Sequence, residues 1–293
     1  MVSSFAERLP ILDNPRADRV RRVSGLVGRS ARMRSGLMLV EGPQAVLELV
    51  RHRPRTLRDV YVREDLWDSS PELIASARAA TRWVHPVSRA VSAALSSDAQ
   101  GICAVASLDA LERELPDAEA GETLVVIAQG RDPGNVGTII RAADAFGARA
   151  VIAVAGTVDA ASPKVVRSSV GSVFHLPVCL APSFAEARDL IHGRGAALLG
   201  TSGGSGSLDL ADLLVEGVSS RSRLSQSHAW AFGNEARGLS AEEMRACDGL
   251  VAIPMTGRAE SLNVASAAAT CLFASQTVRG RTPSSRRVGG RRD

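Results

Sequence analysis

Four short segments combine glycine with polar side chains in a way that could hold a ligand. They are "QGRDPGNVG" (residues 129–137), "GTSGGSGS" (200–207), "FGNEARGL" (232–239) and "IPMTGRAESLN" (253–263). Glycine lets the backbone approach a ligand closely and adopt positive φ angles. Amide, carboxylate and hydroxyl groups can then orient that ligand by hydrogen bonding. Together the segments predict one site rather than four unrelated turns.

Each feature also has a simpler interpretation. The segment 200–207 could be a flexible surface loop, and Asn135 could only cap a helix. Arg141 could be an ordinary arginine on a helix surface, and Glu235 could pair with Arg237. The prediction of one site therefore depends on the fold bringing the segments together.

The elements around these segments support that convergence. An apolar strand precedes each segment, in "TLVVIAQG", "AALLGTS", "HAWAFGNE" and "GLVAIPM", and helical sequences such as "NVGTIIRAADAFGA" alternate with these strands. Such alternation predicts an α/β fold with a parallel sheet and helices on its faces. Ligands of these sheets bind beyond the carboxyl ends of the strands, where all four segments lie.

A smaller α/β unit is predicted in the first part of the chain. "GLMLVEGPQAVLELV" indicates a strand, a Glu-Gly-Pro break and a helix that begins near Pro43. Two further strands and a helix follow, and then a polar stretch typical of a linker. We therefore expect a first domain over residues 1–108, a linker over 109–121, a second domain over 122–279 and a disordered arginine-rich tail over 280–293.

Charge and composition indicate a globular protein with a polyanionic partner. The chain has 293 residues, 45% of them hydrophobic, a net charge of +4 and a pI near 9.3. Lys164 is its single lysine, and residues 16–34 hold seven arginines. The arginine fork suits phosphate. Two interpretations of residues 16–34 remain open, a solvated helix face and a phosphate-contacting surface.

The cysteines and the hydropathy of the sequence indicate the cellular compartment in which the protein works. The four cysteines form no CxxC pair, which argues against a zinc site or a disulfide framework and for a reducing cytosol. No apolar run approaches the roughly 20 residues that a membrane span needs. We expect a soluble, cytoplasmic protein that binds no membrane and no metal.

Three of the segments resemble, in order, the motifs of a known enzyme family. The motif residues are Asn135-Val136-Gly137 with Ile140-Arg141 and Phe146-Gly147, then Gly233-Asn234-Glu235 with Gly238-Leu239, and then Ile253-Pro254-Met255, Gly257 and Ser261-Leu262-Asn263-Val264. This set resembles the SpoU/TrmH-type RNA 2′-O-methyltransferases of the SPOUT superfamily, over roughly residues 122 to 278. The first domain, with "LVEGPQAVLEL", resembles their ribosomal-protein-like substrate-binding domain. The nearest resemblance is to the 23S rRNA methyltransferases, including the thiostrepton-resistance type.

The resemblance implies a fold, a cofactor and a reaction. The expected fold is a parallel α/β sheet whose C-terminal part forms a trefoil knot. The expected reaction moves a methyl group from S-adenosylmethionine to a ribose 2′-hydroxyl without a metal, and the expected assembly is a homodimer through the C-terminal domain. The cofactor contacts that it implies are Thr201, Ser202, Gly233, Ile253 and Leu262.

The resemblance also implies catalytic and RNA-contacting residues. Arg141 would orient the ribose or a phosphate and stabilise negative charge, because arginine loses its proton only above about pH 12. Glu235 would position Arg141 or the substrate. The implied catalytic set is Asn135, Arg141, Glu235, Ser261 and Asn263. The predicted RNA contacts are Arg21, Arg22, Arg29, Arg32, Arg34 and Arg167.

The sequence leaves other functions to consider beside this one. A nucleotide-dependent oxidoreductase is disfavoured, because Gly204 and Gly206 in "GTSGGSGSLD" give only part of the dinucleotide fingerprint and Asp209 replaces its third glycine. A non-catalytic RNA-binding protein with the same fold and a tRNA methyltransferase remain alternatives. We expect rRNA rather than tRNA as the partner, because of the first domain and the basic segments.

Overall fold

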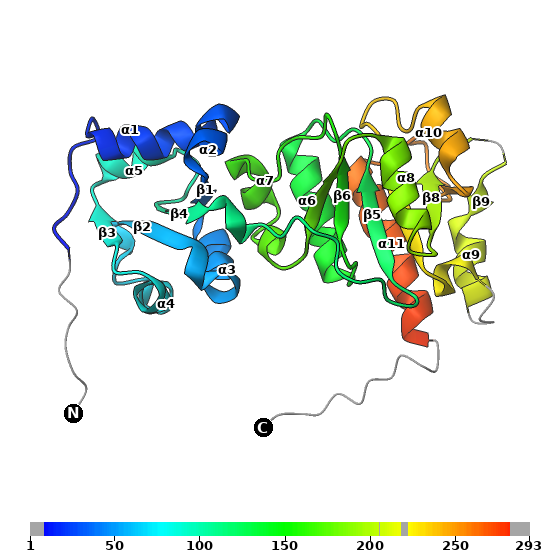
Figure 1. The fold of residues 1–293 in the computed structure, drawn as a ribbon, viewed down its shortest axis with the longest axis horizontal. Coiled ribbons are helices and arrows are strands. Elements are labelled where there is room, and N and C mark those ends of the chain that lie inside the picture. Colours follow the sequence, from blue (N-terminus) through cyan, green and yellow to red (C-terminus); the bar gives the residue numbers. More distant parts are fainter. Residues whose placement is uncertain (1–8, 205, 218–221, 282–293) are drawn as a thin grey trace, which may run out of the picture. The chain divides into compact units, whose positions relative to one another are not determined.

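The chain folds into two compact units. The computed structural model describes residues 9–204, 206–217 and 222–281 (Figure 1). Unit 1 comprises Met1–Glu112 and Asp159–His175, and unit 2 comprises Arg113–Val158 and Leu176–Asp293. Most of the predicted tail, residues 282–293, lies outside the described residues. Every helix in the described part is too short or too polar to cross a membrane.

Unit 1 is built on a four-stranded sheet with the strand order β1-β4-β2-β3. The strands are β1 (Leu37–Glu41), β2 (Leu57–Arg63), β3 (Val84–Val87) and β4 (Ile102–Ser107). β4 runs antiparallel to β1 and β2, whereas β2 and β3 are parallel. All residues of β4 are buried. Its unbroken small and apolar sequence therefore fits a central strand that is covered on both faces.

Helices cover both faces of this sheet (Figure 1). α1 and α5 pack on one face over a core that includes Leu39, Tyr61 and Val105, and α3 and α4 lie on the other. The helices that the early sequence supplies are α1 (Asp18–Ser24), α2 (Arg29–Ser35), α3 (Pro43–His52), α4 (Pro71–Ala80) and α5 (Arg89–Leu95). A later segment adds α7 (Pro163–Ser168) beside β1.

Unit 2 is built on a seven-stranded sheet in which every strand pair is parallel. The order is β7-β6-β5-β10-β8-β11-β9. The strands are β5 (Thr123–Ile127), β6 (Val151–Val154), β7 (Val178–Ala181), β8 (Ala197–Thr201), β9 (Leu208–Asp209), β10 (His228–Phe232) and β11 (Gly249–Ala252). All residues of β5 and β10 are buried, as expected of central strands in a parallel sheet.

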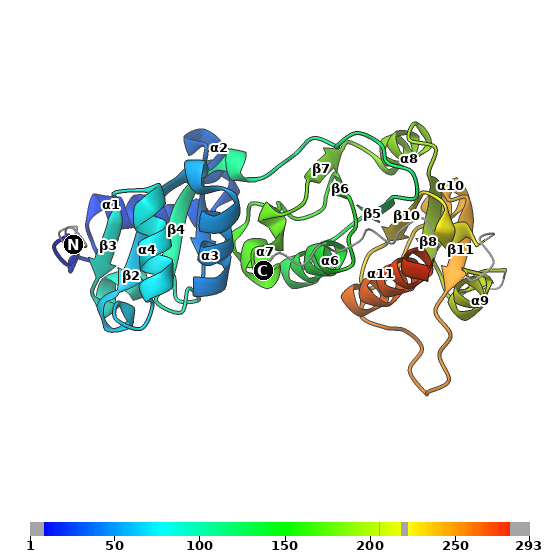
Figure 2. The ribbon, with the colours of Figure 1, turned by 90° about the horizontal axis from the view of Figure 1, so that it is seen from below.

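Two helical layers enclose the sheet of unit 2. α8 and α10 lie on one face, and α6 and α11 lie side by side on the other (Figure 2). The helices are α6 (Pro133–Ala145), α8 (Phe184–His192), α9 (Leu210–Glu216), α10 (Ala241–Ala246) and α11 (Val264–Arg281). Figure 2 also shows the connection from β11 to α11 projecting from the sheet as a long loop. The predicted α/β fold with a smaller preceding unit is confirmed.

The domain limits differ from the predicted ones at one segment. Unit 1 ends at Glu112, inside the expected linker over 109–121. Asp159–His175, which was expected to belong to the second domain, lies instead in unit 1. Val165, Val166 and Phe174 of this segment are at most 1% exposed, so its apolar side chains stabilise its position against β1 and α3.

Candidate functional site

The start of α6 presents Asn135 to the site. Asp132 is the N-cap residue, and its side chain accepts a hydrogen bond from the Asn135 backbone N–H at 2.8 Å. Pro133 occupies the first helical position, where no backbone donor is needed. The interpretation of Asn135 as the helix cap is therefore wrong, because Asp132 has that role. The Asn135 side chain is left to make tertiary contacts.

Asn263 joins α11 to α6. Its Oδ1 accepts hydrogen bonds from the backbone N–H groups of Ala265, at 2.9 Å, and Ser266, at 3.4 Å. This is the bonding pattern of a helix N-cap, and it directs the other side of the amide outward. Asn263 Nδ2 donates to Asn135 Oδ1 at 3.0 Å. Two amides from helices 128 residues apart in sequence are thereby fixed against each other.

Glu235 lies in the turn after β10 and completes this cluster. Its Oε1 accepts from the Asp132 backbone N–H at 3.2 Å and from Asn135 Nδ2 at 3.5 Å. Its Oε2 accepts from Asn234 Nδ2 at 3.3 Å. These donors show that Glu235 orients Asn135, and the interpretation of Glu235 as a surface partner of Arg237 receives no support from its contacts.

A cleft of about 430 Å³ opens beside this cluster. Its walls come from the ends of β8, β10 and β11 and from the loop before α11, all at the carboxyl edge of the sheet. The volume is within the range of about 300 to 1,000 Å³ that is typical of small-molecule sites. All five residues that were expected to contact the cofactor line it: Thr201, Ser202, Gly233, Ile253 and Leu262. Glu235 and Ser261 of the expected catalytic set line it as well.

Gly233 lets two stretches of backbone meet at the bottom of this cleft. A Cβ atom at this position would lie 2.1 Å from the Gly238 carbonyl carbon and 2.2 Å from the Leu239 nitrogen. The turn that follows is closed by two backbone hydrogen bonds between Asn234 and Gly238, at 2.9 and 2.8 Å. Any side chain at Gly233 would therefore require movement of the backbone that carries Glu235.

Arg141 is placed differently from the rest of the catalytic set. It lies exposed on α6, and its side chain forms no hydrogen bond or ion pair with any residue in the described part of the chain. In this structure Glu235 therefore contacts Asn135 and not Arg141. The guanidinium of Arg141 remains available to a substrate.

A thiol close to the cleft is not a reactive group. Cys247 is half-buried, and its Sγ lies 2.8 Å from the position of a Cβ built on Gly200. Burial, together with the nearby carboxylates of Asp248 and Glu243, raises the pKa of the Cys247 thiol to about 12. The thiol stays protonated at neutral pH and is a poor nucleophile.

Sequence reasoning missed two arginines near the cluster. A second hollow shares Asn234, Glu235 and Arg237 with the wall of the cleft and is also lined by Arg131 and Asn135. Arg131 and Arg237 are exposed and bring positive charge to this side of Glu235. Their place within the motif segments was the only signal for them in the sequence.

Four of the predicted RNA-contacting arginines are exposed on unit 1. Arg21, Arg22, Arg29 and Arg34 lie on α1 and α2. Arg21 also pairs with Asp18 at 2.8 Å, but its side chain remains 70% exposed. These positions leave their guanidinium groups accessible to phosphate.

The prediction that Arg32 contacts RNA is wrong, because this side chain is buried. Arg32 is 2% exposed. Its Nη1 donates to the carbonyls of Leu26, at 3.0 Å, and Val27, at 2.6 Å, and its Nη2 pairs with Asp159 at 2.7 Å. Arg32 therefore fixes the turn before α2 to the start of the segment 159–175, both within unit 1.

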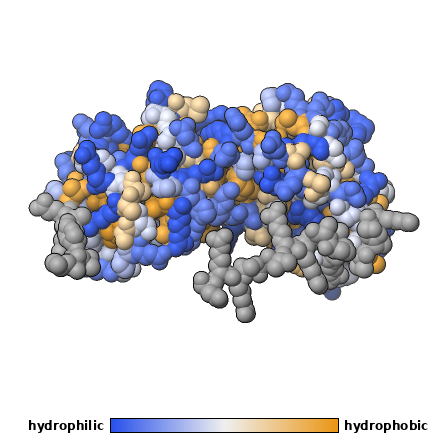
Figure 3. Space-filling model, turned by 60° about the horizontal axis from the view of Figure 1, so that its bottom comes forward, coloured by the Kyte–Doolittle hydropathy of each residue, from blue (hydrophilic) through white to orange (hydrophobic). Residues whose placement is uncertain are grey.

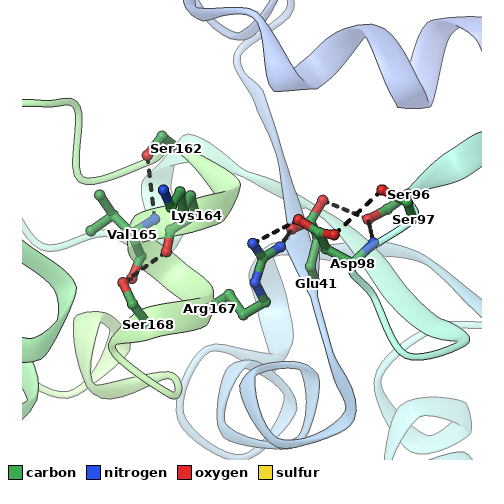
Figure 4. Close-up of polar contacts among 9 residues, drawn as sticks. All are labelled: Glu41, Ser96, Ser97, Asp98, Ser162, Lys164, Val165, Arg167 and Ser168. Atoms are coloured by element: carbon green, nitrogen blue, oxygen red, sulfur yellow. Dashed lines mark hydrogen bonds and ion pairs between the residues drawn. The ribbon is translucent and has the colours of Figure 1, made fainter. Parts of the chain in front are cut away.

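Arg167 is also engaged within unit 1 (Figure 4). Its guanidinium pairs with Glu41 at the end of β1 and with Asp98 Oδ2, the latter at 2.8 Å. Glu41 is 5% exposed, and its other oxygen accepts from Ser96 at 2.7 Å. The Arg167 side chain is itself 30% exposed. Its principal contacts are therefore two carboxylates, and an RNA contact stays a prediction.

The structure is that of an α/β protein with a polar cluster and a cleft at the carboxyl edge of a parallel sheet, the edge where ligands of such sheets bind. Residues 122–273 match the SpoU rRNA Methylase family, and residues 39–110 match the RNA 2′-O ribose methyltransferase substrate-binding family. This chain belongs to the SpoU methylase family.

Two relatives and a solved structure agree with this assignment. A 23S rRNA (guanosine-2′-O-)-methyltransferase, RlmB, of Bordetella pertussis is 33% identical over 244 residues, which cover 81% of this chain and 96% of that protein. A 23S rRNA (uridine(2479)-2′-O)-methyltransferase of Streptomyces viridochromogenes is 33% identical, covering 96% and 99% of the two chains. The solved structure of the SpoU methyltransferase AviRb from Streptomyces viridochromogenes with the cofactor AdoMet has a TM-score of 0.75 at 30% identity, and covers 91% and 98%.

These matches confirm several predictions from the sequence. The chain is an RNA 2′-O-ribose methyltransferase of the SpoU type with a substrate-binding unit before its catalytic unit. The family assignment identifies S-adenosylmethionine as the cofactor, as the resemblance of the motifs implied. The alternative of a nucleotide-dependent oxidoreductase is thereby rejected.

Proposed function

We propose that this protein transfers a methyl group from S-adenosylmethionine to a ribose 2′-hydroxyl of 23S rRNA. The observation that carries the proposal is the contact chain Asn263–Asn135–Glu235. It stands between a cleft with the expected cofactor residues and a hollow lined by arginine. The names of the two relatives support 23S rRNA as the substrate class. A tRNA substrate remains the alternative.

The cleft has the chemistry that S-adenosylmethionine requires. Ile253 and Leu262 offer apolar surface for a purine ring, and Thr201 and Ser202 offer hydroxyl groups. Gly233 lines the same cleft, and its missing side chain lets the backbone of Gly238 and Leu239 approach it closely. When bound, the cofactor supplies a methyl group on a positively charged sulfur, and it leaves as a neutral thioether.

The protein's own residues would then align the nucleophile. The amides of Asn135 and Asn263 are fixed by hydrogen bonds, so their geometry is preorganised for a ribose hydroxyl. Arg141, which has no partner among the described residues, would hold the adjacent phosphate and stabilise negative charge that develops on the hydroxyl oxygen. Ser261 lines the cleft and would contact the methionine end or the ribose.

RNA recognition would extend to both units. The exposed arginines Arg21, Arg22, Arg29 and Arg34 would contact phosphate from unit 1, and Arg131 and Arg237 would do so near the cleft. Aromatic residues make up only 3% of the chain. This scarcity favours recognition of RNA shape and backbone over base stacking.

Three further expectations belong to this proposal. The carboxyl-end loops 233–239 and 253–263 would form the trefoil knot. Two features would permit such threading: backbone segments meet closely at Gly233, and the buried residues Ala265 and Ala268 have small side chains. The chain would form a homodimer through unit 2, where Phe273 of α11 is 54% exposed. The surface in Figure 3 shows apolar patches among mostly hydrophilic side chains. A cytoplasmic location would follow from an rRNA substrate.

The test is methyl incorporation from labelled S-adenosylmethionine into rRNA from a strain that lacks this gene. We expect label in 23S rRNA at one 2′-O-methylated ribose, and none in rRNA from the parent strain, whose site is already filled. Total tRNA in a parallel reaction tests the alternative substrate. Incorporation into tRNA alone would replace 23S rRNA by tRNA. Incorporation into neither RNA, with RNA binding retained, would favour a non-catalytic RNA-binding protein.

A further inference from the structure

Three side chains of the metal-ligating type converge in unit 1, away from the cleft. His52 Nε2 lies 3.3 Å from Glu48 Oε2, and His175 Nε2 lies 3.2 Å from the same oxygen. One ligand atom from each of the three residues lies within 4.8 Å of the others. The two imidazole rings are 4.2 Å apart between centroids. We call Glu48, His52 and His175 the His-Glu cluster.

We propose that the His-Glu cluster binds a divalent transition-metal ion of the zinc class. Zinc bonds of about 2.0 to 2.1 Å in a tetrahedron place neighbouring ligand atoms about 3.3 to 3.4 Å apart. The distances from Glu48 Oε2 to the two imidazole nitrogens match this separation. Two imidazoles and one carboxylate suit zinc and its neighbours better than Mg²⁺ or Ca²⁺, which prefer oxygen ligands.

The helix α3 orients two of the ligands. Glu48 and His52 are four residues apart on this helix, and therefore share one face. Glu48 Oε1 accepts from Gln44 Nε2 at 2.7 Å, which leaves Oε2 facing the histidines. Such outer hydrogen bonds commonly fix the ligands of metal sites. Arg51 lies 3.6 Å from the same Oε1, and its charge is shared with Glu72.

The third ligand is fixed by contacts that need no metal. Arg53 Nε donates to the carbonyl of Phe174, the residue before His175, at 3.1 Å. Gly171 packs so closely on α3 that a Cβ there would lie 2.6 Å from Glu48 Cβ. The backbone of this segment therefore sits directly against the stem of Glu48. The cluster is preorganised, which lowers the cost of binding an ion.

The exposure of the cluster indicates an exchangeable site with water at the fourth position. The side chains of Glu48, His175 and His52 are 13%, 24% and 48% exposed. Three protein ligands plus an open position allow the ion to exchange more readily than in a closed four-ligand site. A bound ion would tie α3, inside the substrate-binding match, to a segment inside the methylase match, both within unit 1.

The sequence could not reveal this site, and the expectation of no metal rested on the cysteine spacing. The Glu48–His52 spacing of four residues was visible, but Glu48 and His175 are 127 residues apart. Only the placement of residues 159–175 in unit 1 brings them together.

Metal binding can be measured on the full chain after removal of any affinity tag. A titration of Zn²⁺ against a chromophoric chelator should give one equivalent per chain. Removing a ligand should weaken binding by at least about tenfold, since even loss of an outer partner costs about 10- to 100-fold. We therefore expect this loss in His52→Ala and in His175→Ala. His192→Ala is the matched control, because His192 is a similarly exposed histidine that pairs with Asp248 in unit 2.

Two further readouts do not depend on enzyme activity. Co²⁺ should give a tetrahedral visible spectrum in the parent and His192→Ala proteins and not in His52→Ala. Zn²⁺ should slow amide hydrogen exchange at Phe174 and His175. His52 is half-exposed near the end of α3, so His52→Ala keeps the test meaningful if His175→Ala fails to fold. The proposal is overturned if the parent chain binds no stoichiometric Zn²⁺, or if His52→Ala and His192→Ala bind it equally.

Discussion

The amide of Asn263 serves both a helix and the site. Its oxygen caps α11, and its nitrogen reaches Asn135 on α6. Because the cap fixes the orientation of the amide, the contact with Asn135 is aimed before any substrate binds. Glu235 fixes the same Asn135 from the turn after β10. At the residue scale, the site is a set of polar groups that hydrogen-bond to one another.

The two roles of Asn263 can be separated by substitution. Asn263→Ser keeps an N-cap oxygen but loses the reach to Asn135, whereas Asn263→Ala loses both. We expect the free energy of unfolding to fall by about 1 kcal/mol in the alanine variant and to change little in the serine variant. Single-turnover methylation should fall by about tenfold or more in both variants. If the Asn263→Ser variant kept the parental methylation rate, the contact between Asn263 and Asn135 would be dispensable.

Substitution of Arg141 should affect methylation without affecting stability, because its side chain has no partner among the described residues. Arg141→Ala should leave the urea midpoint nearly unchanged, since exposed substitutions usually alter stability by less than about 0.5 kcal/mol. Single-turnover methylation at saturating cofactor should fall by about 100-fold or more. Arg141→Lys should recover only part of the rate, because an ammonium lacks the planar fork. Near-parental rates in Arg141→Ala would remove Arg141 from the mechanism.

At the scale of elements, β10 and α11 meet through a buried polar network. His228 Nε2 lies 2.8 Å from Ser275 Oγ, and Trp230 Nε1 donates to the same oxygen at 2.8 Å. His228 Nδ1 faces the Gln226 carbonyl at 2.8 Å. Burial lowers the pKa of His228 to about 4. A neutral imidazole in the sheet thus helps to fix the helix that carries Asn263.

This buried imidazole predicts a pH dependence of stability. The pKa of His228 is about 4 when folded and about 6.5 when unfolded, so the unfolded chain binds more protons between these values. Its contribution is complete above about pH 6.5 and declines as the pH falls toward about 4, by up to roughly 3 kcal/mol. Urea unfolding at pH 7.5 and pH 5 should show a smaller loss in His228→Gln than in the parent. Equal losses would contradict this assignment.

The turn after β10 gives a second prediction at this scale. Gly233→Ala would place a Cβ within 2.3 Å of three backbone atoms of residues 238 and 239, so the free energy of unfolding should fall by about 1 to 3 kcal/mol or more. Isothermal titration should also show weaker cofactor binding. Gly257→Ala is the control, because its added Cβ would meet nothing within 4 Å. Equal stability of the two variants would show that the turn can move.

At the scale of the whole molecule, the arginines divide into two groups. Arg32 and Arg167 pair with carboxylates within unit 1 and connect the segment 159–175 to it. Arg29 and Arg34 lie exposed on α2. The same residue type therefore stabilises one unit of the molecule and places exposed charge on its surface, and the sequence alone does not separate these two roles.

This division can be tested with matched arginine variants. Arg29→Ala and Arg34→Ala should each weaken rRNA binding and lower the slope of log affinity against log salt by about one unit, with no change in stability. Arg32→Ala should cost about 3 to 5 kcal/mol of unfolding free energy, because it removes a buried guanidinium that pairs with Asp159 and donates to the carbonyls of Leu26 and Val27. Filter binding at several salt concentrations and urea unfolding measure the two effects. An unchanged salt slope in both exposed variants would exclude α2 from the RNA interface.

Much of the fold, and which residues line the cleft, could be predicted because both depend on local sequence. Apolar strands followed by glycine-rich segments predicted a parallel sheet with ligand-binding loops at its carboxyl edge. The resemblance of the motifs singled out Thr201, Gly233 and Leu262 within those segments, and these three residues line one cleft. The sequence left open whether Asn135 caps the helix or contacts a ligand, because Asp132 and Asn135 are both good cap residues. Only the structure shows which side chain turns back to the helix.

The sequence by itself determined the class of protein, because the order of the three motifs and the alternation of strands and helices can be recognised without knowing any long-range contact. The tertiary structure decided which polar groups meet. It joined Asn135 to Asn263, buried Arg32 against Asp159, and carried residues 159–175 into unit 1. These outcomes depend on apolar packing between segments more than 100 residues apart, such as Phe174 against α3. Such packing is a property of the assembled core, and no local pattern of residues encodes it.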